Sequence, residues 1–268
     1  MYTRNNSGPK IEPYGTPILF WSIVLQTVPA VDFRVYNFGI TALTGDKYHI
    51  ENSQSTSFLG LILDKTLSWQ SHIDKIFAKL KSACYVLRIL NPILTVSNNM
   101  RMIYFSYIHS IITYGIIFGG NSATSGEVFQ LQKRAIRIIT NSHKRTSCQN
   151  LFKELNILLL QSQYLLSLAM YVVKNREDFT SNSDIHSMNT WYKSNLHPTL
   201  LRLTKSQKGV YYAGITMCNI LPLKIKEMSD EIKDFKRSLK KFLLHGSFYT
   251  VEEYLDWTFR HDLNTRYS

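Results

Sequence analysis

The stretch FLGLILDKTLSWQSHI at residues 58–73 decides how the chain is organised, because two structural periods meet within it. Phe58 to Asp64 is a short apolar run closed by an acidic residue, which is typical of a buried strand. Ser68 then stands where an N-cap residue begins a helix. We therefore expect a strand, a short turn and a helix that starts near Trp69.

The segment before this stretch predicts a small β element. Apolar and polar residues alternate at 31–35, as in a half-buried strand, and residues 44–47 are typical of a turn. Residues 48–50 are expected to open a short strand that pairs with 58–63. The β element thus covers about 31–63.

Beyond Trp69 the apolar residues recur every three or four positions, which predicts amphipathic helices. The first helix ends at Asn91-Pro92, and its stripe contains Ile73, Ile76, Leu80, Cys84, Leu87 and Leu90. The second spans about 96–118, with one face formed by Met100, Ile103, Tyr107, Ile111 and Tyr114. The third spans about 125–140 and buries Val128, Leu131, Ala135 and Ile138. Because each stripe must be covered, these helices predict an antiparallel helical bundle.

The remainder of the chain is expected to be mainly helical. Two helices are predicted near 148–155 and 161–176, followed by a polar linker at 179–198. The β-branched and aromatic residues from Val210 to Met217 predict a short strand, and Ser229 is expected to cap the last helix. The expected fold is therefore mainly α, with three parts: a poorly organised segment 1–49, a strand and helical bundle 50–145, and a C-terminal region 146–268.

Composition indicates the kind of partner. The formal net charge is +12 and the isoelectric point is near 9.5, which favours nucleic acid or an anionic membrane surface. A basic but simply solvated exterior is the alternative. The three cysteines are far apart and form no CxxC pair, so we expect no disulfide partner and an intracellular compartment, either cytoplasm or nucleus.

One uncharged stretch is long enough to cross a bilayer. Residues 102–126 contain no Asp, Glu, Lys or Arg, but they include several Ser, Thr and Tyr residues and end in Gly119-Gly120-Asn121. A helix buried on most sides of a bundle accounts for this pattern better. We therefore expect no membrane partner for this stretch.

Several blocks in a fixed order resemble one protein family. They are YG at 114–115 with Gly119, LQKRAIRII at 131–139, LF at 151–152 with LNIL at 155–158, NILP at 219–222, and FK at 235–236 with Leu239. Together with FLG, LD, LSW and HI at 58–73, they resemble the thumb and post-thumb part of reverse transcriptases from non-LTR retrotransposons, jockey-like elements in particular. The resemblance covers about residues 50–245.

The resemblance implies a thumb-like bundle that holds a primer–template duplex. Phe58, Leu59 and Gly60 correspond to the element that supports the primer end, although Gly60 is equally explained as a strand residue packed under a helix. The basic helix faces are expected to contact the phosphates of an RNA/DNA duplex without sequence preference, through Lys75, Lys79, Lys133, Arg134, Arg137, Lys144 and Arg145. Five of these lie within 133–145, and a solvated helix face is the alternative.

The catalytic centre of that family is not found in this sequence. Nucleotidyl transfer requires two Mg²⁺ ions held by carboxylates, and the intact family enzyme supplies adjacent aspartates for this purpose. This sequence contains no Asp-Asp pair, and Asp64 corresponds to a residue after the catalytic centre. We therefore predict no catalytic residue, no metal ligand and no cofactor on this chain, which is expected to be inactive as a polymerase on its own.

Three hypotheses follow. The first is a truncated reverse transcriptase fragment that binds nucleic acid through a basic helical thumb. The second is a non-enzymatic helical interaction protein, derived from such an element, that binds a protein or a membrane surface. The third is an active enzyme whose metal site comes from another chain, which a primer-extension assay with Mg²⁺ would detect.

Aromatic residues and one histidine leave two interpretations open. Tyr104, Tyr107 and Tyr114 are suited to stacking on bases, but their helical spacing favours the core. Trp69 is expected to be a core residue. His72 is either a phosphate contact or, as is more common for a histidine at a helix start, structural.

Overall fold

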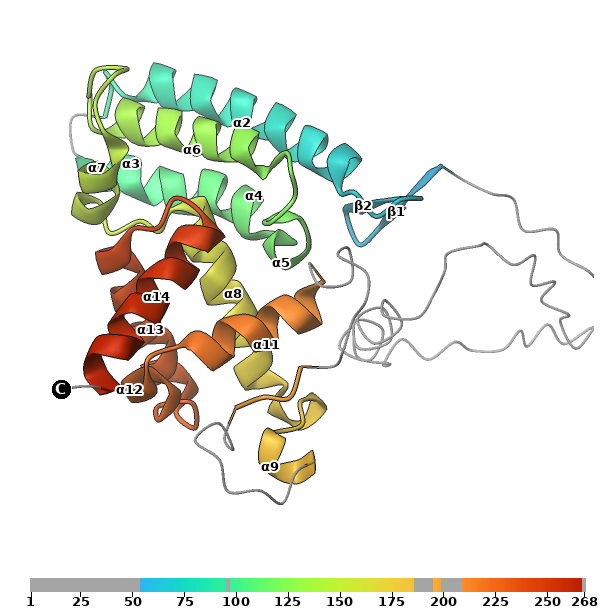
Figure 1. The fold of residues 1–268 in the computed structure, drawn as a ribbon. Coiled ribbons are helices and arrows are strands. Elements are labelled where there is room, and N and C mark those ends of the chain that lie inside the picture. The colour runs from blue at the N-terminus through green and yellow to red at the C-terminus, as the bar shows by residue number, and fades with distance from the viewer. Residues whose placement is uncertain (1–53, 95–96, 186–194, 199–208, 267–268) are drawn as a thin grey trace, which may run out of the picture.

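The computed structural model describes residues 54–94, 97–185, 195–198 and 209–266 (Figure 1). This part of the chain is mainly helical, with one two-stranded antiparallel sheet ahead of the helices, which confirms the expected fold class. The strands expected at 31–35 and 48–50 lie outside the described residues.

The sheet is a β-hairpin. β1 (Ser55–Phe58) pairs with β2 (Leu61–Asp64), and Leu59 and Gly60 form the turn with φ of +47° and +80°. A two-residue loop with positive φ at both positions is the turn that matches the twist of a hairpin. The apolar run predicted to be one buried strand is therefore divided by this turn, and within β2 only Leu61 is buried.

Asp64 organises the connection from β2 to α2 (Gln70–Leu90). Its carboxylate accepts the backbone N–H groups of Ser68 and Trp69, each at 3.1 Å, and the hydroxyl groups of Thr66 and Ser68. Burial raises the pKa of this carboxyl, but the four hydrogen bonds outweigh burial and the pKa is lowered. The helix N-cap is Trp69 in the left-handed conformation, one residue later than the predicted Ser68.

Two further passes of the chain follow α2, the first antiparallel to it and the second parallel to it (Figure 1). The chain returns through a nearly continuous helical stretch and then runs forward again beside α2, so that α2 and α6 are side by side and parallel. The elements are α3 (Ser97–Ile103), the π-helix η1 (Tyr104–His109), α4 (Ser110–Thr113), α5 (Ile116–Gly119) and α6 (Ser125–Ile139).

The buried face of the returning stretch differs from the predicted one. Tyr107 and Tyr114 are exposed, and the buried residues recur every fourth position as Met100, Tyr104, Ile108, Ile112 and Ile116. A regular α-helix drifts from such a spacing, whereas the i→i+5 bonds of η1 widen the turn and keep these residues on one face. The stretch also breaks at Gly115, where φ is +69° and a Cβ would lie 2.5 Å from Leu61 Cδ2.

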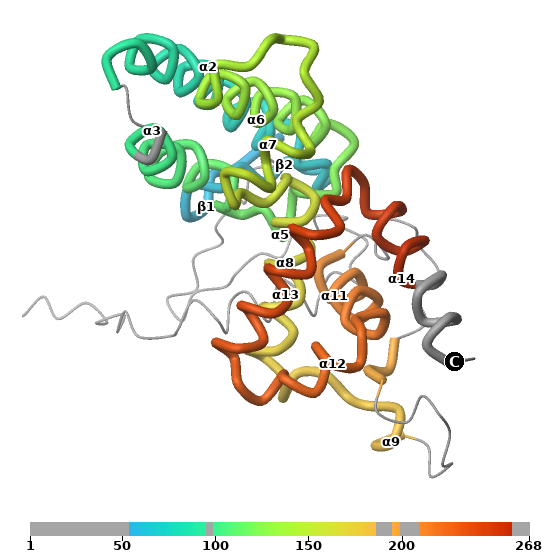
Figure 2. The backbone as a smooth tube through the Cα atoms, turned by 90° about the vertical axis from the view of Figure 1, so that its left-hand side faces the viewer, coloured from blue at the N-terminus to red at the C-terminus, as the bar shows by residue number. Residues whose placement is uncertain are grey.

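The C-terminal half packs around α8 (Figures 1 and 2). This helix contacts α4, α5, α6, α11 and α13. The elements of this half are α7 (Cys148–Glu154), α8 (Leu160–Lys174), η2 (Arg176–Asp178), α9 (Asn182–Ile185), α11 (Val210–Ile220), α12 (Leu223–Lys226), α13 (Ile232–Gly246) and α14 (Val251–Arg266).

Three predictions for this half are corrected. The strand predicted from Val210 is the helix α11, where Gly214 lets the backbone approach α8 so closely that a Cβ would lie 2.8 Å from Val172. The cap of α13 is Glu231, not Ser229, and α14 was not expected at all. Within the predicted linker, the described residues form the short helix α9 and an isolated β-bridge between Ser181 and Leu196.

A buried glutamine joins three parts of the core. Gln132 on α6 is 1% exposed, and its Nε2 donates to Tyr104 Oη at 2.9 Å and to the Leu158 carbonyl at 3.0 Å. Its Oε1 accepts the Leu160 N–H at 2.9 Å. The same apolar core includes residues of α2, α6, α7 and α8, so this amide fixes the α7–α8 connection against the bundle.

We predict that Gln132→Ala lowers the free energy of unfolding by about 2–4 kcal/mol, because buried backbone groups of Leu158 and Leu160 lose their partners. Urea unfolding followed by circular dichroism measures the change. Gln130→Ala, at an exposed position of the same helix, is the matched control and is expected to change the unfolding free energy by less than about 0.5 kcal/mol. Equal effects of the two substitutions would contradict this role.

We also predict that stability falls on mild acidification. Burial lowers the pKa of His72, and Lys75 and Lys79 lower it further. At this position the unfolded chain therefore binds a proton more readily than the folded chain. The contribution of neutral His72 to the free energy of unfolding is complete above about pH 6.5 and is lost as the pH falls through the folded pKa. His72→Gln should flatten the decline in unfolding free energy between about pH 7 and 5. The exposed His143→Gln should leave it unchanged, and an unaltered slope in the His72 variant would refute the assignment.

Candidate nucleic-acid interface

An open groove lies where α2 and α6 end. Its volume is about 690 Å³, and its lining includes the cations Arg88, Lys133, Arg134, Arg137 and Lys144. None of its lining residues is acidic. The groove therefore collects positive charge from two helices and from the loop that follows α6.

The two helix ends are held together by local sequence. Asn141 adopts φ +51° after α6, the Ser142 N–H donates to the Arg137 carbonyl at 3.0 Å, and the Asn141 N–H donates to Ile138 at 3.3 Å. This is the Schellman arrangement, which asparagine tolerates at its left-handed position. Asn91 Nδ2, at the end of α2, donates to Asn141 Oδ1. The asparagines thus position one wall of the groove against the other.

Two groove cations are fixed by contacts of their own. Arg137 donates from Nε at 3.1 Å and from Nη2 at 3.0 Å to the Thr146 carbonyl, which holds the loop after α6. Lys133 Nζ lies 4.6 Å from the centre of the Phe129 ring and 6.0 Å from that of Tyr249. Both side chains are half-buried, so their positive ends are ordered before any ligand arrives.

The other three groove cations are available to a ligand. Arg88, Arg134 and Lys144 are exposed, and no residue in the described part of the chain forms a hydrogen bond or ion pair with their side chains. Two helix C-termini at this place contribute roughly −0.5 charge each. Against five cations they leave a net charge of about +4, which an anion can neutralise.

The structure gathers four of the seven predicted contact residues and separates the others. Lys133, Arg134, Arg137 and Lys144 line the groove. Arg145 is exposed on the same loop but is not part of the groove lining.

Lys75 and Lys79 lie far from this groove. They are about 20 and 14 Å from Arg88 along the α2 axis, and are rotated by roughly 140–180° around it. Both are exposed, Lys75 near the start of the helix and Lys79 near its middle. The predicted contact residues therefore form two groups and not one continuous helix face.

Arg88 was missed as a candidate. It lies in the last turn of α2, three residues before Asn91, and its position beside α6 depends on the parallel packing of two helices distant in sequence. The sequence signal for Arg88 was the helix stop at Asn91-Pro92, because a basic residue in the last turn of a helix lies beside the carbonyl groups at the helix end.

The predicted primer-grip-like residues form the exposed tip of the hairpin. Leu59 is 55% exposed, and Tyr114 Oη donates to the Leu59 carbonyl. Gly60 is neither in a strand nor under a helix, and a Cβ there would meet Tyr114 only at an ordinary 3.5 Å. Phe58, the last residue of β1, is half-buried. The tip contacts Tyr114 and belongs to the hairpin that leads into the start of α2, whereas the groove is at the end of α2, about 30 Å along the helix.

Among the tyrosines, Tyr104 belongs to the core, and Tyr107 and Tyr114 are exposed on the returning stretch. Trp69 packs on the core as predicted, with its ring stacked on Phe118 at 5.3 Å between centroids. The interpretation of these residues as one core face is therefore right for one tyrosine only.

His72 is structural. It is 3% exposed, its Nδ1 accepts the Ile62 N–H at 3.5 Å, and its Nε2 has no hydrogen-bond partner. A side chain buried in this way joins the hairpin to α2 and is inaccessible to a phosphate.

The described residues contain no group of three or more His, Cys, Asp or Glu side chains arranged to hold a metal ion. The oxygens of Asp64 are occupied by the hydrogen bonds of its own turn. Cys84, Cys148 and Cys218 are free thiols. In the described part of the chain, every helix is too short or too polar to cross a bilayer.

Comparison with known proteins gives no relative. No protein-family model matches this chain, and no significant match was found among curated proteins or among solved structures.

Proposed function

We propose that this chain binds the sugar–phosphate backbone of a nucleic-acid duplex, without sequence preference, through the groove at the ends of α2 and α6. The observation that carries the proposal is the set of five cations with no acidic residue in the lining. Arginine and lysine contacts to phosphates supply affinity that does not depend on base sequence.

The geometry supports a ligand with repeated negative charges. Arg137 and Lys133 are held in place, whereas Arg88, Arg134 and Lys144 are exposed and have no side-chain partner among the described residues. Ordered cations reduce the entropy lost on binding, and exposed arginines offer paired N–H donors to phosphate oxygens. Such an arrangement suits a backbone better than a single small anion, because the five charges are spread over two helices and a loop.

The motif order at 58–73, 114–119, 131–139, 151–158 and 219–239 supports an origin in a non-LTR retrotransposon reverse transcriptase. In that proposal the duplex is the RNA/DNA hybrid that a thumb holds, and the compartment is the cytoplasm or nucleus. Polymerisation is not assigned to this chain, because the sequence contains no adjacent aspartates to hold two Mg²⁺ ions.

The hairpin tip and the groove are suited to two parts of the same duplex. The hairpin leads into the start of α2 and the groove lies at its end, and the helix between them is about 30 Å long, close to one helical turn of a duplex, which is about 34–36 Å. Lys75 and Lys79 lie on the side of α2 away from Arg88, so they are not counted among the contacts of this span. We therefore expect full contact to require at least about one turn of duplex.

A second candidate function is supported by apolar residues on the outer face of α2 and just beyond it. Tyr85 is 64% exposed, Ile89 48% and Ile93 68%. Neighbouring exposed apolar side chains of this size are typical of protein interaction surfaces. An interaction protein would bind its partner with little dependence on salt, in contrast to a backbone-binding protein.

The groove is tested by the salt dependence of duplex binding. With about five phosphates neutralised, the affinity for a 16-bp RNA/DNA hybrid should fall about 500-fold between 50 and 200 mM NaCl. Arg88→Gln and Arg134→Gln should each reduce the slope of log K against log [NaCl] by about 1. Fluorescence anisotropy with an end-labelled hybrid measures both effects.

Lys174→Gln is the matched control, since it removes one exposed charge from the far end of α8. It should leave the slope unchanged, and two hybrids of unrelated sequence should bind within about threefold of each other. Salt-independent binding, or equal slopes for the groove variants and the control, would refute the groove as the binding site.

The hairpin tip is tested separately through Leu59, whose φ of +47° is unfavourable for a side chain. Leu59→Gly should raise the unfolding free energy by about 0.5–1 kcal/mol, yet weaken binding of a 16-bp hybrid about threefold to tenfold. Leu67→Gly is the control, because Leu67 also has positive φ (+50°) but lies outside the tip. A stabilised Leu59 variant with unchanged affinity would exclude contact between the tip and the duplex.

A further inference from the structure

A second cluster of basic groups lies away from the groove, where α3 and α13 both approach α7, because Arg101 is bonded to the Leu155 carbonyl at the end of α7 and α13 packs on α7. Arg101 is near the end of α3, and His109 is the last residue of η1. Lys236 and Lys240 are one turn apart on α13, so they lie on the same flank of that helix. Figure 2 presents α3, α7 and α13 from one side of the molecule.

Aromatic stacking and a short hydrogen bond order half of this cluster. Arg101 Nε donates to the Leu155 carbonyl at 2.7 Å, and its guanidinium lies 5.1 Å from the centre of the Phe105 ring. His109 contacts the same ring, edge to face, with 5.2 Å between centroids. The terminal nitrogens of Arg101 form no hydrogen bond with any residue that the structure describes.

Arg101 and Lys236 repel the charge of Lys240, and the two lysines disfavour a proton on His109. Burial lowers the pKa of Lys240, and Arg101 and Lys236 lower it further. Burial likewise lowers the pKa of His109, followed by Lys240 and Lys236. No carboxylate contributes to either shift, so among the residues that the structure describes these like charges have no nearby counter-charge.

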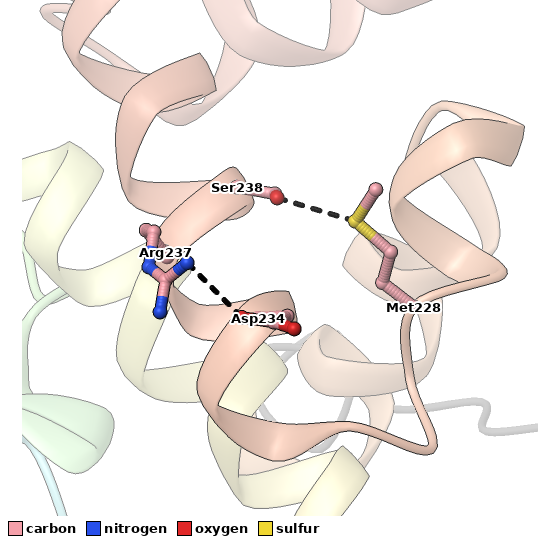
Figure 3. A network of polar contacts seen from close by, with 4 residues as sticks. All are labelled: Met228, Asp234, Arg237 and Ser238. Carbon is pink, nitrogen blue, oxygen red and sulfur yellow. Dashed lines mark hydrogen bonds and ion pairs between the residues drawn. The ribbon is translucent and has the colours of Figure 1, made fainter.

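The acidic residue of α13 serves another cation. Asp234 pairs with Arg237 at 3.2 Å on the exposed side of the helix, beside the contact from Ser238 Oγ to Met228 Sδ (Figure 3). Asp234 is the only Asp or Glu within 232–246. The charges of Lys236 and Lys240 therefore remain uncompensated on their own helix.

We propose that Arg101, His109, Lys236 and Lys240 form a second binding site, specific for a phosphate group. An arginine that is held by its Nε, whose terminal nitrogens bond to none of the described residues and which lies beside two ammonium groups, matches the several oxygens of a phosphate. The half-buried positions of Arg101, His109 and Lys240 strengthen each contact, because the effective dielectric is lower there than in water. This site is independent of the groove, and its phosphate is either free in solution or part of a bound nucleic-acid backbone.

The test uses thermal unfolding of the full chain with inorganic phosphate, at constant ionic strength maintained with NaCl. About 10 mM phosphate should raise the Tm of the wild type by about 2–4 °C. Lys240→Gln should abolish this shift and, without phosphate, unfold at or above the wild-type temperature, because it relieves repulsion. If Lys240 were needed only for packing, its substitution would lower the Tm without phosphate. A lost phosphate response together with an unchanged or raised Tm therefore indicates a binding role.

Lys233→Gln is the matched control, at an exposed position of the same helix outside the cluster, and should retain the phosphate response. An equal phosphate shift in Lys240→Gln, or a lower Tm for it without phosphate, would overturn the site. The groove variant Arg134→Gln should respond to phosphate like the wild type, which separates this site from the proposed function.

The source of the phosphate is distinguished by duplex binding. If Lys240→Gln lowers the salt slope for the 16-bp hybrid by about 1, the site contacts the nucleic-acid backbone. If the slope is unchanged while the phosphate response is lost, the site binds free phosphate. Both outcomes support the site, and they differ only in what supplies the anion.

Discussion

The side-chain amide of Gln132 is the interaction on which the arrangement of this molecule depends. It donates to Tyr104 and to the Leu158 carbonyl and accepts from Leu160, so one buried group satisfies η1 and the α7–α8 connection together. Buried polar networks of this kind impose one geometry, because every alternative leaves a donor or acceptor unpaired. The rotation of α6 about its axis is thereby fixed.

That rotation also determines the groove. Lys133 and Arg134 follow Gln132 directly, and Arg137 lies little more than one turn further on. When the amide points into the core, helical geometry places the two arginines toward the surface at the end of α2. The candidate site is thus largely a consequence of core packing, and the loop after α6 adds Lys144, the Asn141 contact to α2 and the Thr146 carbonyl that holds Arg137.

Amphipathic helices were predictable wherever a regular period held. The limits of α2, α6, α7 and α8 follow from stripes with three- and four-residue steps, and Asn91-Pro92 ends α2 as expected. The face of the returning stretch was not predictable, because the π-helix η1 changes the period without a distinctive residue. The segment from Val210 was mistaken for a strand because a helix buried against α8 carries apolar residues on most sides.

The candidate site was predictable in part for a similar reason. Four groove cations are close together in sequence, so local clustering found them, whereas Arg88 joins them only through packing between distant helices. Lys75 and Lys79 were grouped with them by charge alone and lie elsewhere on α2. Sequence reasoning thus finds charges that share a helix, but not those that tertiary structure brings together.

The two basic clusters differ in how the folded chain tolerates them. The groove cations lie at helix C-termini, where the helix dipoles favour positive charge, so this charge is compatible with the fold in the absence of a ligand. Lys236 and Lys240 lie on the flank of α13, before its last turn, and their neighbours Arg101 and His109 are also basic. Repulsion within the second cluster therefore reduces the stability of the folded chain, and an anion bound there would relieve it. We therefore expect an anion to stabilise the folded chain mainly through this cluster, even though the groove contains more charge.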